Sequence, residues 1–249
     1  MEDHLRNLVV ESLENLHRSG VGQLRKVSPT RGNFQEGPEP TPRESAATPP
    51  DLLPSPAPAS PSVARELQIL QESVVSCTQC SELASTRTQT VFGVGHPGAR
   101  LCFLGEAPGA DEDRQGEPFV GAAGQLLDKI IAACRLRRQD VYILNVLKCR
   151  PPGNRNPLPE EATNCRSFLQ RQLDLIQPEF ICCLGTVAAQ NLLGTTETIG
   201  KLRGQIHTFQ GFQVVCTYHP AYLLRNPAAK NHVWDDMKFL MRALGVELE

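Results

Sequence analysis

The sequence predicts an α/β fold, a three-layer sandwich built on a short and mainly parallel central sheet. Three observations favour this class. Short apolar runs alternate along residues 63–249 with longer segments of helical periodicity, which is typical of a parallel sheet covered by helices. The chain has 249 residues, enough for one domain with a sizeable core and an appendage. It contains no run of about 18 apolar residues, so no membrane span is expected.

Four apolar runs predict the strands of this sheet. They are residues 100–104 (RLCFL), 141–145 (VYILN), 180–184 (FICCL) and 214–217 (VVCT). Each run is apolar without a break, which indicates a buried strand.

Five segments predict helices between and around these strands. They are residues 63–76, 122–136, 159–176, 186–193 and 231–244. In residues 122–136 the apolar side chains recur at spacings of three and four. Residues 159–176 begin with Pro159, Glu160 and Glu161, and proline followed by acids is typical of a helix start.

Residues 1–62 have a different composition from the rest. They hold 10 of the 20 prolines, and such a segment buries too little apolar surface to offset its ordering entropy. We expect residues 20–62 to be a disordered tether with polyproline character. Residues 3–18 (DHLRNLVVESLENLHR) place leucines and Val9 on one helical face, which predicts an amphipathic helix that docks on a separate protein partner. The chain is therefore divided into residues 1–62 and a domain at 63–249.

Four of the nine cysteines have a spacing that suggests a shared metal site. Cys77 and Cys80 are separated by two residues, and Cys149 and Cys165 by fifteen. Thiolates select soft metals, either zinc or an iron–sulfur cluster. Zinc is disfavoured because only the first pair forms a tight knuckle, and a thioredoxin-like pair is disfavoured because a predicted helix precedes Cys77. The remaining cysteines are expected in the core: Cys102, Cys134, Cys182, Cys183 and Cys216.

Three polar groups follow the predicted strands. Gly105 and Glu106 follow the first strand, Asn145 closes the second, and His219 follows the last. Ligands of open α/β sheets bind beyond the carboxyl ends of the strands, so these groups should converge on one edge. Taken singly, Asn145 and His219 would be interpreted as turn residues.

Three longer strings carry a resemblance to a known family. They are GEAPGADEDRQGEPFVGAAGQLL (105–127), NVLKCRPPGNRNP (145–157) and TYHPAYLLRNP (217–227). Together they closely resemble the family 4 uracil-DNA glycosylases, the iron–sulfur branch of that superfamily, from about Cys77 to Trp234. The resemblance implies a monofunctional enzyme that removes uracil from DNA and starts base-excision repair. It also implies a structural [4Fe-4S] cluster on the four spaced cysteines.

The resemblance assigns candidate roles around a flipped uracil. The Asn145 amide can accept from uracil N3–H and donate to O4, a pattern that cytosine presents reversed. His219 would donate to uracil O2, where charge grows as the glycosidic bond breaks. Phe119 would stack on the base, although core burial is a competing role. Gly105 and Ala107 would line the base site, and Glu106 would orient water or stabilise the sugar cation.

DNA contacts are expected from local features, because residues 63–249 are formally neutral. These residues carry 19 Lys and Arg against 19 Asp and Glu, so basic patches must hold the backbone. Leu223 or Leu224 would wedge into the stack, and Arg225 would meet phosphate. Arg203 is expected to be a further DNA contact, and the other candidates are Lys148, Arg150, Arg155, Lys201 and Lys230.

Two other function classes remain open. One is a metal-stapled nucleic-acid-binding module that recruits a partner through residues 1–62. The other is a magnesium-dependent phosphoesterase that uses Glu106 and the acidic run Asp111, Glu112 and Asp113, although that run alone would be interpreted as a solvated loop. Nine cysteines without a signal peptide predict a reducing compartment. We therefore expect a cytoplasmic monomer that associates with the nucleoid through DNA.

Overall fold

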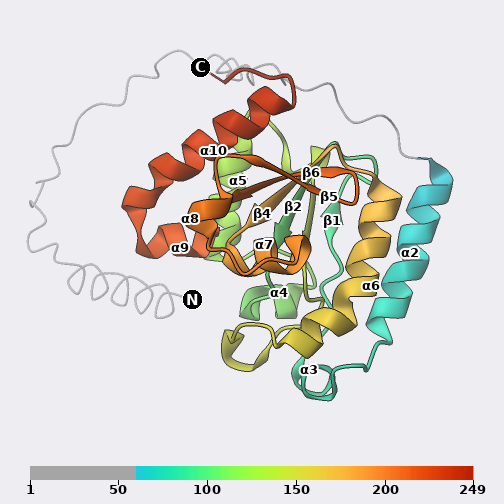
Figure 1. Ribbon diagram of the computed structural model, residues 1–249. Helices are drawn as coiled ribbons and strands as arrows, with labels where there is room; N and C mark the ends of the chain where they lie inside the picture. The colour runs from blue at the N-terminus through green and yellow to red at the C-terminus, as the bar shows by residue number, and fades with distance from the viewer. Residues whose placement is uncertain (1–59, 249) are drawn as a thin grey trace, which may run out of the picture. The chain divides into compact units, whose positions relative to one another are not determined.

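The structure is a computed structural model that describes residues 60–248. These residues form a sheet with helices on both faces (Figure 1). The predicted helix at residues 3–18 and nearly all of the predicted tether lie outside the described residues. No helix in the described part of the chain is both long and apolar enough to cross a membrane.

The sheet has six strands in the order β1-β3-β2-β4-β6-β5. Neighbours among β3, β2, β4 and β6 are parallel, while β1 and β5 add antiparallel edges. The bounds are β1 Val94–Gly95, β2 Leu101–Gly105, β3 Tyr142–Asn145, β4 Phe180–Leu184, β5 Ile206–Phe209 and β6 Phe212–Thr217. The mainly parallel sheet expected from the sequence is confirmed.

The described helices surround this sheet. They are α2 Pro61–Val75, α3 Ser81–Thr86, α4 Ala110–Gln115, α5 Ala122–Ala133, α6 Pro159–Ile176, α7 Thr186–Leu193, α8 Ile199–Leu202, α9 Pro220–Arg225 and α10 Lys230–Ala243. Short 3-10 turns lie at Arg138–Asp140, Pro152–Asn154 and Pro227–Ala229. The Ser60 hydroxyl caps α2 by accepting from the Ser62 N–H, so this helix begins two residues before the predicted start.

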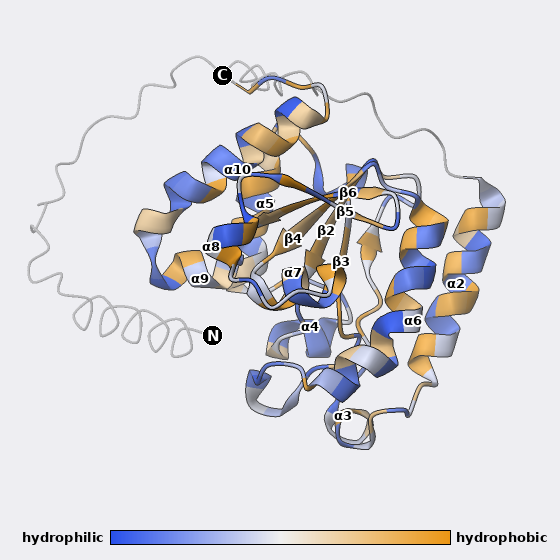
Figure 2. Ribbon diagram, in the orientation of Figure 1, coloured by the Kyte–Doolittle hydropathy of each residue, from blue (hydrophilic) through white to orange (hydrophobic). Residues whose placement is uncertain are grey.

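Two apolar cores lie on the two faces of the sheet. In β2, Leu101 and Phe103 pack with α5 and α10 on one face, while Cys102 and Leu104 pack with α2, α6 and α7 on the other. This alternation follows from the two-residue period of a strand. Figure 2 shows largely apolar strands between helices that carry both apolar and polar residues. The two cores make the predicted three-layer sandwich.

The sequence missed both edge strands. β1 has only two residues, and β5 alternates between exposed and half-buried positions instead of forming an apolar run. The strands found by the sequence are those whose residues are almost all buried. Their register pairs Gly105 with Asn145 and Leu184 with Thr217, which brings the carboxyl ends of the parallel strands to one edge.

Candidate active site

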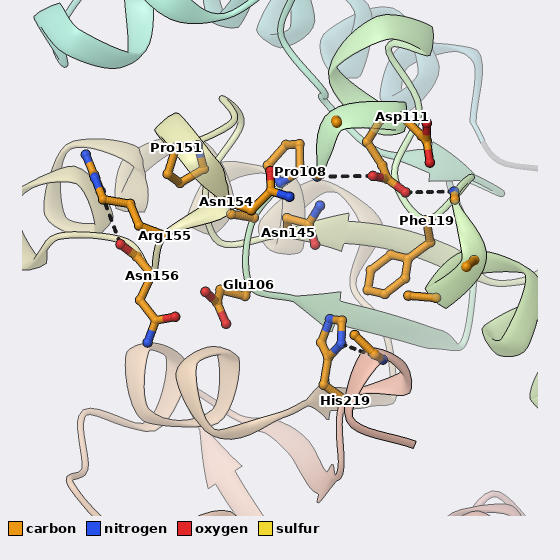
Figure 3. Close-up of a pocket in the computed structure, with 18 of the residues that line it drawn as sticks. Glu106, Pro108, Asp111, Phe119, Asn145, Pro151, Asn154, Arg155, Asn156 and His219 are labelled. Carbon is orange, nitrogen blue, oxygen red and sulfur yellow. Dashed lines mark hydrogen bonds between the residues drawn. The ribbon is translucent and has the colours of Figure 1, made fainter. Parts of the chain in front are cut away.

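A cavity of about 520 Å³ lies beyond the carboxyl ends of β2, β3 and β6. The loop after β2 supplies Glu106 and Ala107, the end of β3 supplies Asn145, and His219 comes from the turn before α9. Phe119 completes the wall between α4 and α5 (Figure 3). The structure therefore brings the candidate base-site residues together, with Gly105 directly behind them.

Asn145 presents an unpartnered acceptor at this site. Its side chain is 2% exposed, and its Oδ1 has no hydrogen-bond partner in the described chain. Gly105 lies against it on β2, where a Cβ would stand 2.2 Å from Oδ1 and 2.6 Å from the Phe119 ring. A buried acceptor without a donor costs about 1–3 kcal/mol, so Asn145 Oδ1 is suited to a ligand N–H.

Phe119 is held in a constrained position beside Asn145. Its backbone has a φ of 55°, which is uncommon for a residue with a side chain. A Cβ at Gly124 would lie 1.9 Å from the Phe119 carbonyl oxygen, so only glycine permits this approach. The Phe119 ring faces the His219 ring with centroids 5.6 Å apart and planes 29° apart. Phe119 is therefore both buried in the core and part of the cavity wall, and its stacking on a flipped base stays a prediction.

His219 is held as a neutral donor. Its Nδ1 accepts from the Ala221 N–H at 3.1 Å, so the proton of the neutral ring lies on Nε2. Burial lowers the pKa of His219 to about 4, the Arg225 charge lowers it further, and the Glu112 charge opposes this. At neutral pH the ring therefore offers an uncharged Nε2–H.

Two carboxylates six residues apart have contrasting environments. Glu106 lines the cavity, its carboxylate accepts no hydrogen bond from residues 60–248, and burial raises its pKa. Glu112 accepts three backbone N–H bonds, from Val120 and Gly121 at 2.9 Å each and from Gly109 at 3.1 Å. Glu106 can therefore act on a ligand or water, whereas Glu112 ties the loop after β2 to the loop that carries Phe119.

The acidic run is neither a solvated loop nor a free magnesium site. Asp113 is buried and accepts the Thr88 N–H with both oxygens, and Asp111 pairs with Arg114. With Glu112 also bound to backbone N–H groups, these carboxylates stabilise the fold. A sequence signal for Glu112 is its place three residues after the N-cap Gly109, from which an acid can reach back to the N-cap N–H.

The four spaced cysteines converge from three segments. Cys77 and Cys80 lie between α2 and α3, Cys149 follows β3, and Cys165 lies in α6. Burial raises the pKa of Cys149, the Arg87 guanidinium lowers it, and the charges of Cys77 and Cys80 raise it. The Cys165 thiol responds likewise to Cys149 and Cys80. The four thiols are thus electrostatic neighbours.

Protein donors already point at these sulfurs. Arg87 Nη1 donates to Cys149 Sγ at 3.1 Å, and its Nη2 donates to the Val75 carbonyl at 3.2 Å. Asn164 Nδ2 lies 3.5 Å from Cys80 Sγ. Among residues 60–248, no three His, Cys, Asp or Glu side chains form a group that could hold one metal ion. The role of Arg87 carried no sequence signal, because Arg87 lies in a polar stretch far from Cys149.

Lys148 is buried and is not available to DNA. Its side chain is 1% exposed, and its Nζ donates to the Asn145 carbonyl oxygen at 2.8 Å. Burial lowers the pKa of Lys148 to about 7, and the charges of Cys165 and Cys149 raise it. The expectation that Lys148 contacts DNA is wrong, because a sequence pattern does not show which way a side chain points.

Several other predicted DNA contacts are engaged inside the protein. Arg203 pairs with the buried Asp236 at 3.0 Å, donates to the His232 carbonyl and lies over the Tyr218 ring. Arg155 lines the cavity but is bound to Glu82 and Glu161. The structure thus disagrees with Arg203 as a free phosphate contact. Arg225 and Lys230 are exposed.

The two leucines of α9, Leu223 and Leu224, differ in their exposure to solvent. Leu223 is 1% exposed and belongs to the core beside α5 and α10, so it cannot enter a base stack and its assignment as a DNA contact is wrong. Leu224 is 49% exposed. Of the two candidates, Leu224 alone has a side chain free to be the wedge.

Comparisons with known proteins agree with this geometry. The model of the uracil DNA glycosylase superfamily matches residues 92–238. The type-4 uracil-DNA glycosylase of Archaeoglobus fulgidus is 46% identical over 173 residues, covering 66% of this chain and 86% of that protein. The type-4 enzyme of Thermotoga maritima is 46% identical over 64% of this chain and 84% of its own length. A type-5 uracil-DNA glycosylase of Pyrobaculum aerophilum is 31% identical over 60% of this chain and 80% of its own length. This chain therefore belongs to the uracil-DNA glycosylase superfamily and to its type-4 branch.

Proposed function

We infer that the protein is a monofunctional DNA glycosylase that takes uracil out of the DNA stack and hydrolyses its N-glycosidic bond. The observation that carries the proposal is the buried, unpartnered Asn145 Oδ1. This oxygen would accept from uracil N3–H while Nδ2 donates to O4. Cytosine places a bare acceptor at N3, which would leave Oδ1 unpaired and so lower affinity.

The transition state of this reaction places negative charge on uracil O2 and positive charge on the sugar. The neutral His219 would donate Nε2–H to O2, and a fixed donor of this kind is worth about a hundred- to a thousandfold in rate. Glu106 would accept a proton from water or stabilise the sugar cation, which requires its ionised form. The Phe119 ring would cover one face of the base.

A flipped base also requires contacts with the DNA around it. We propose that Leu224 fills the space left in the stack and that Arg225 and Lys230 contact phosphates. The exposure of these three side chains on and after α9, next to His219, supports this assignment. The product would be an abasic site that enters base-excision repair.

We further propose a structural [4Fe-4S] cluster on Cys77, Cys80, Cys149 and Cys165. Two features of the donor set support it: the four sulfurs are electrostatic neighbours, and the Arg87 guanidinium donates to Cys149 Sγ. A cubane also holds its four thiolates farther apart than a single ion does. Bound there, the cluster would fix the loop after Cys149, which lines the cavity at Pro151 and Asn154.

One assay tests the activity directly. Matched oligonucleotides that contain uracil or thymine at one position are incubated with the protein, and abasic sites are then cleaved with alkali. We expect strand cleavage only with uracil, and it should persist in EDTA. Cleavage that required added magnesium would instead favour the phosphoesterase, and DNA binding without any cleavage would favour the recruiting module.

A further inference from the structure

Tyr222 is an exposed aromatic residue of α9 at the wall of the cavity. It is 40% exposed, and it lines the cavity together with Arg225. Arg225 follows three residues later, so the two side chains lie on the same side of the helix. Phe119, the aromatic residue of the inner wall, is only 6% exposed. In the proposed function Phe119 covers the uracil, and Tyr222 has no role.

The Tyr222 ring has an aromatic partner on one face only. Tyr218 stacks on it, with ring centroids 5.1 Å apart and planes 20° apart. Within residues 60–248 no second ring stacks on Tyr222, so its other face has no aromatic partner in the described chain. Aromatic faces of this kind bind nucleic-acid bases, because every base has a π-face of its own.

Tyr218 is fixed in turn by a buried charge network. The Arg203 guanidinium lies 5.6 Å from the centre of the Tyr218 ring and pairs with Asp236 at 3.0 Å. Asp236 is 1% exposed and also accepts the Thr217 hydroxyl at 2.6 Å, which ties the network to the end of β6. A ring that is already ordered loses little conformational entropy when it binds a ligand. Arg203, which was expected to contact DNA, thus supports the pair of stacked tyrosines.

We propose that the face of Tyr222 not covered by Tyr218 stacks on an unpaired base next to the flipped uracil, and that single-stranded DNA is therefore the favoured substrate. The exposure of Tyr222 indicates a neighbouring base, since the uracil itself would lie between the buried Phe119 and Asn145. The exposed Arg225, one helical turn away, supplies positive charge for an adjoining phosphate. In a duplex the neighbouring base stays paired and stacked within the DNA, so it is not available to the ring. The inference rests on the proposed function, since it requires a flipped uracil.

Tyr222→Phe and Tyr222→Leu form a matched pair of variants, because the first keeps an aromatic ring and the second keeps only apolar bulk. On a single-stranded uracil oligonucleotide we expect kcat/KM of Tyr222→Leu to fall by about 5- to 100-fold, the usual loss for one stacked base. With the same uracil in a duplex it should fall by less than about threefold, since no unpaired base meets the ring. Tyr222→Phe should retain the preference for the single strand, and thermal melts check that both variants fold.

A second measurement locates the stacked base. Single-stranded substrates carry an alkali-stable abasic analogue on the 5′ or the 3′ side of the uracil. The unmodified protein should lose about 5- to 100-fold in kcat/KM on one of the two, because the base that stacks is missing. Tyr222→Leu should lose less than about threefold on that same substrate, because the effects of removing two partners of one contact are not additive. Affinity for these strands, measured by fluorescence anisotropy, should follow the same pattern.

Several results would overturn the proposal. They are an equal loss on single strand and duplex in Tyr222→Leu, no loss on either, or an equal loss in Tyr222→Phe. If Tyr222→Leu does not fold, the abasic substrates decide with the unmodified protein alone, and full activity on both of them would rule out the stack. An unmodified protein that excises no uracil would instead reject the proposed function, and anisotropy with the same strands would still test the stacking.

Discussion

The base pocket and the cysteine site share the segment that follows β3, yet they differ in the hydrogen bonding of their polar atoms. In the pocket, Asn145 Oδ1 and the Glu106 carboxylate accept no hydrogen bond from residues 60–248. At the cysteine site, Arg87 already donates to Cys149 Sγ and Asn164 to Cys80 Sγ. The unpaired atoms of the pocket suit a transient ligand, whereas the fixed donors at the sulfurs suit the proposed structural cluster.

The largest effect should come from removing the pocket donors and acceptors. Asn145→Ala and His219→Ala should each lower kcat by about a hundred- to a thousandfold, because each removes an interaction that strengthens in the transition state. Affinity for a uracil-free oligonucleotide should change little, since neither side chain would face the backbone. Near-normal excision in both variants would place uracil in another pocket.

At the cysteine site the expected loss is in metal and stability. Cys149→Ala should lose iron and melt at a lower temperature, because metal binding contributes to folding free energy. Cys102→Ala, in the core on β2, should keep its iron. Iron and sulfide per protein chain and a thermal melt check both variants. Stoichiometric zinc without iron in freshly prepared anaerobic protein would contradict the cluster.

As the pH is lowered, activity should be lost at a pH above that at which His219 is protonated. Burial raises the pKa of Glu106 above its ordinary 4.5, and burial lowers that of His219 to about 4. As the pH falls, Glu106 is protonated first, so kcat should decrease by about tenfold per pH unit below the Glu106 pKa. The pH profile of Glu106→Gln should be flat in this range; an unchanged acid limb would show that another group titrates.

The adjacent leucines of α9 sharpen the contrast between surface and core. Leu223→Ala should lower the free energy of unfolding by about 2–5 kcal/mol, the usual cost of truncating a buried leucine. Leu224→Ala should leave stability within about 0.5 kcal/mol. It should still slow excision from duplex DNA by about tenfold, because a wedge offsets a few kcal/mol of unstacking. Denaturant melts and duplex excision assays check both variants. A stable Leu223→Ala protein with slow excision, together with an unchanged excision rate in Leu224→Ala, would identify Leu223 as the wedge.

The smallest effect is expected from the N-terminal extension. Deleting residues 1–59 keeps Ser60, which caps α2. Melting temperature and excision on naked oligonucleotides should stay almost unchanged if residues 3–18 serve a separate partner. A decrease in melting temperature of several degrees would show that this segment packs on the rest of the chain.

The sequence predicted the parts of the fold that are apolar without interruption, such as β4 at Phe180–Leu184 and α6 at Pro159–Ile176, with their observed bounds. It also placed Asn145 and His219 at the same edge of the sheet. It could not predict which charged side chains turn inward, because Lys148, Arg155 and Arg203 look like surface cations until their partners are folded beside them. Leu223 and Leu224 were likewise equivalent until the helix fixed which one faces the core.

The glycines behind the pocket restrict how its specificity could evolve. Any side chain at Gly105 would collide with Asn145 and Phe119 together, and one at Gly124 would collide with the Phe119 backbone. A substitution at Gly105 or Gly124 would therefore force Asn145 or Phe119 out of position. Acceptance of a new base would have to arise elsewhere on the cavity wall, for example at the half-buried Ala107 and the exposed Tyr222, and a mutant library aimed at other deaminated bases should start there.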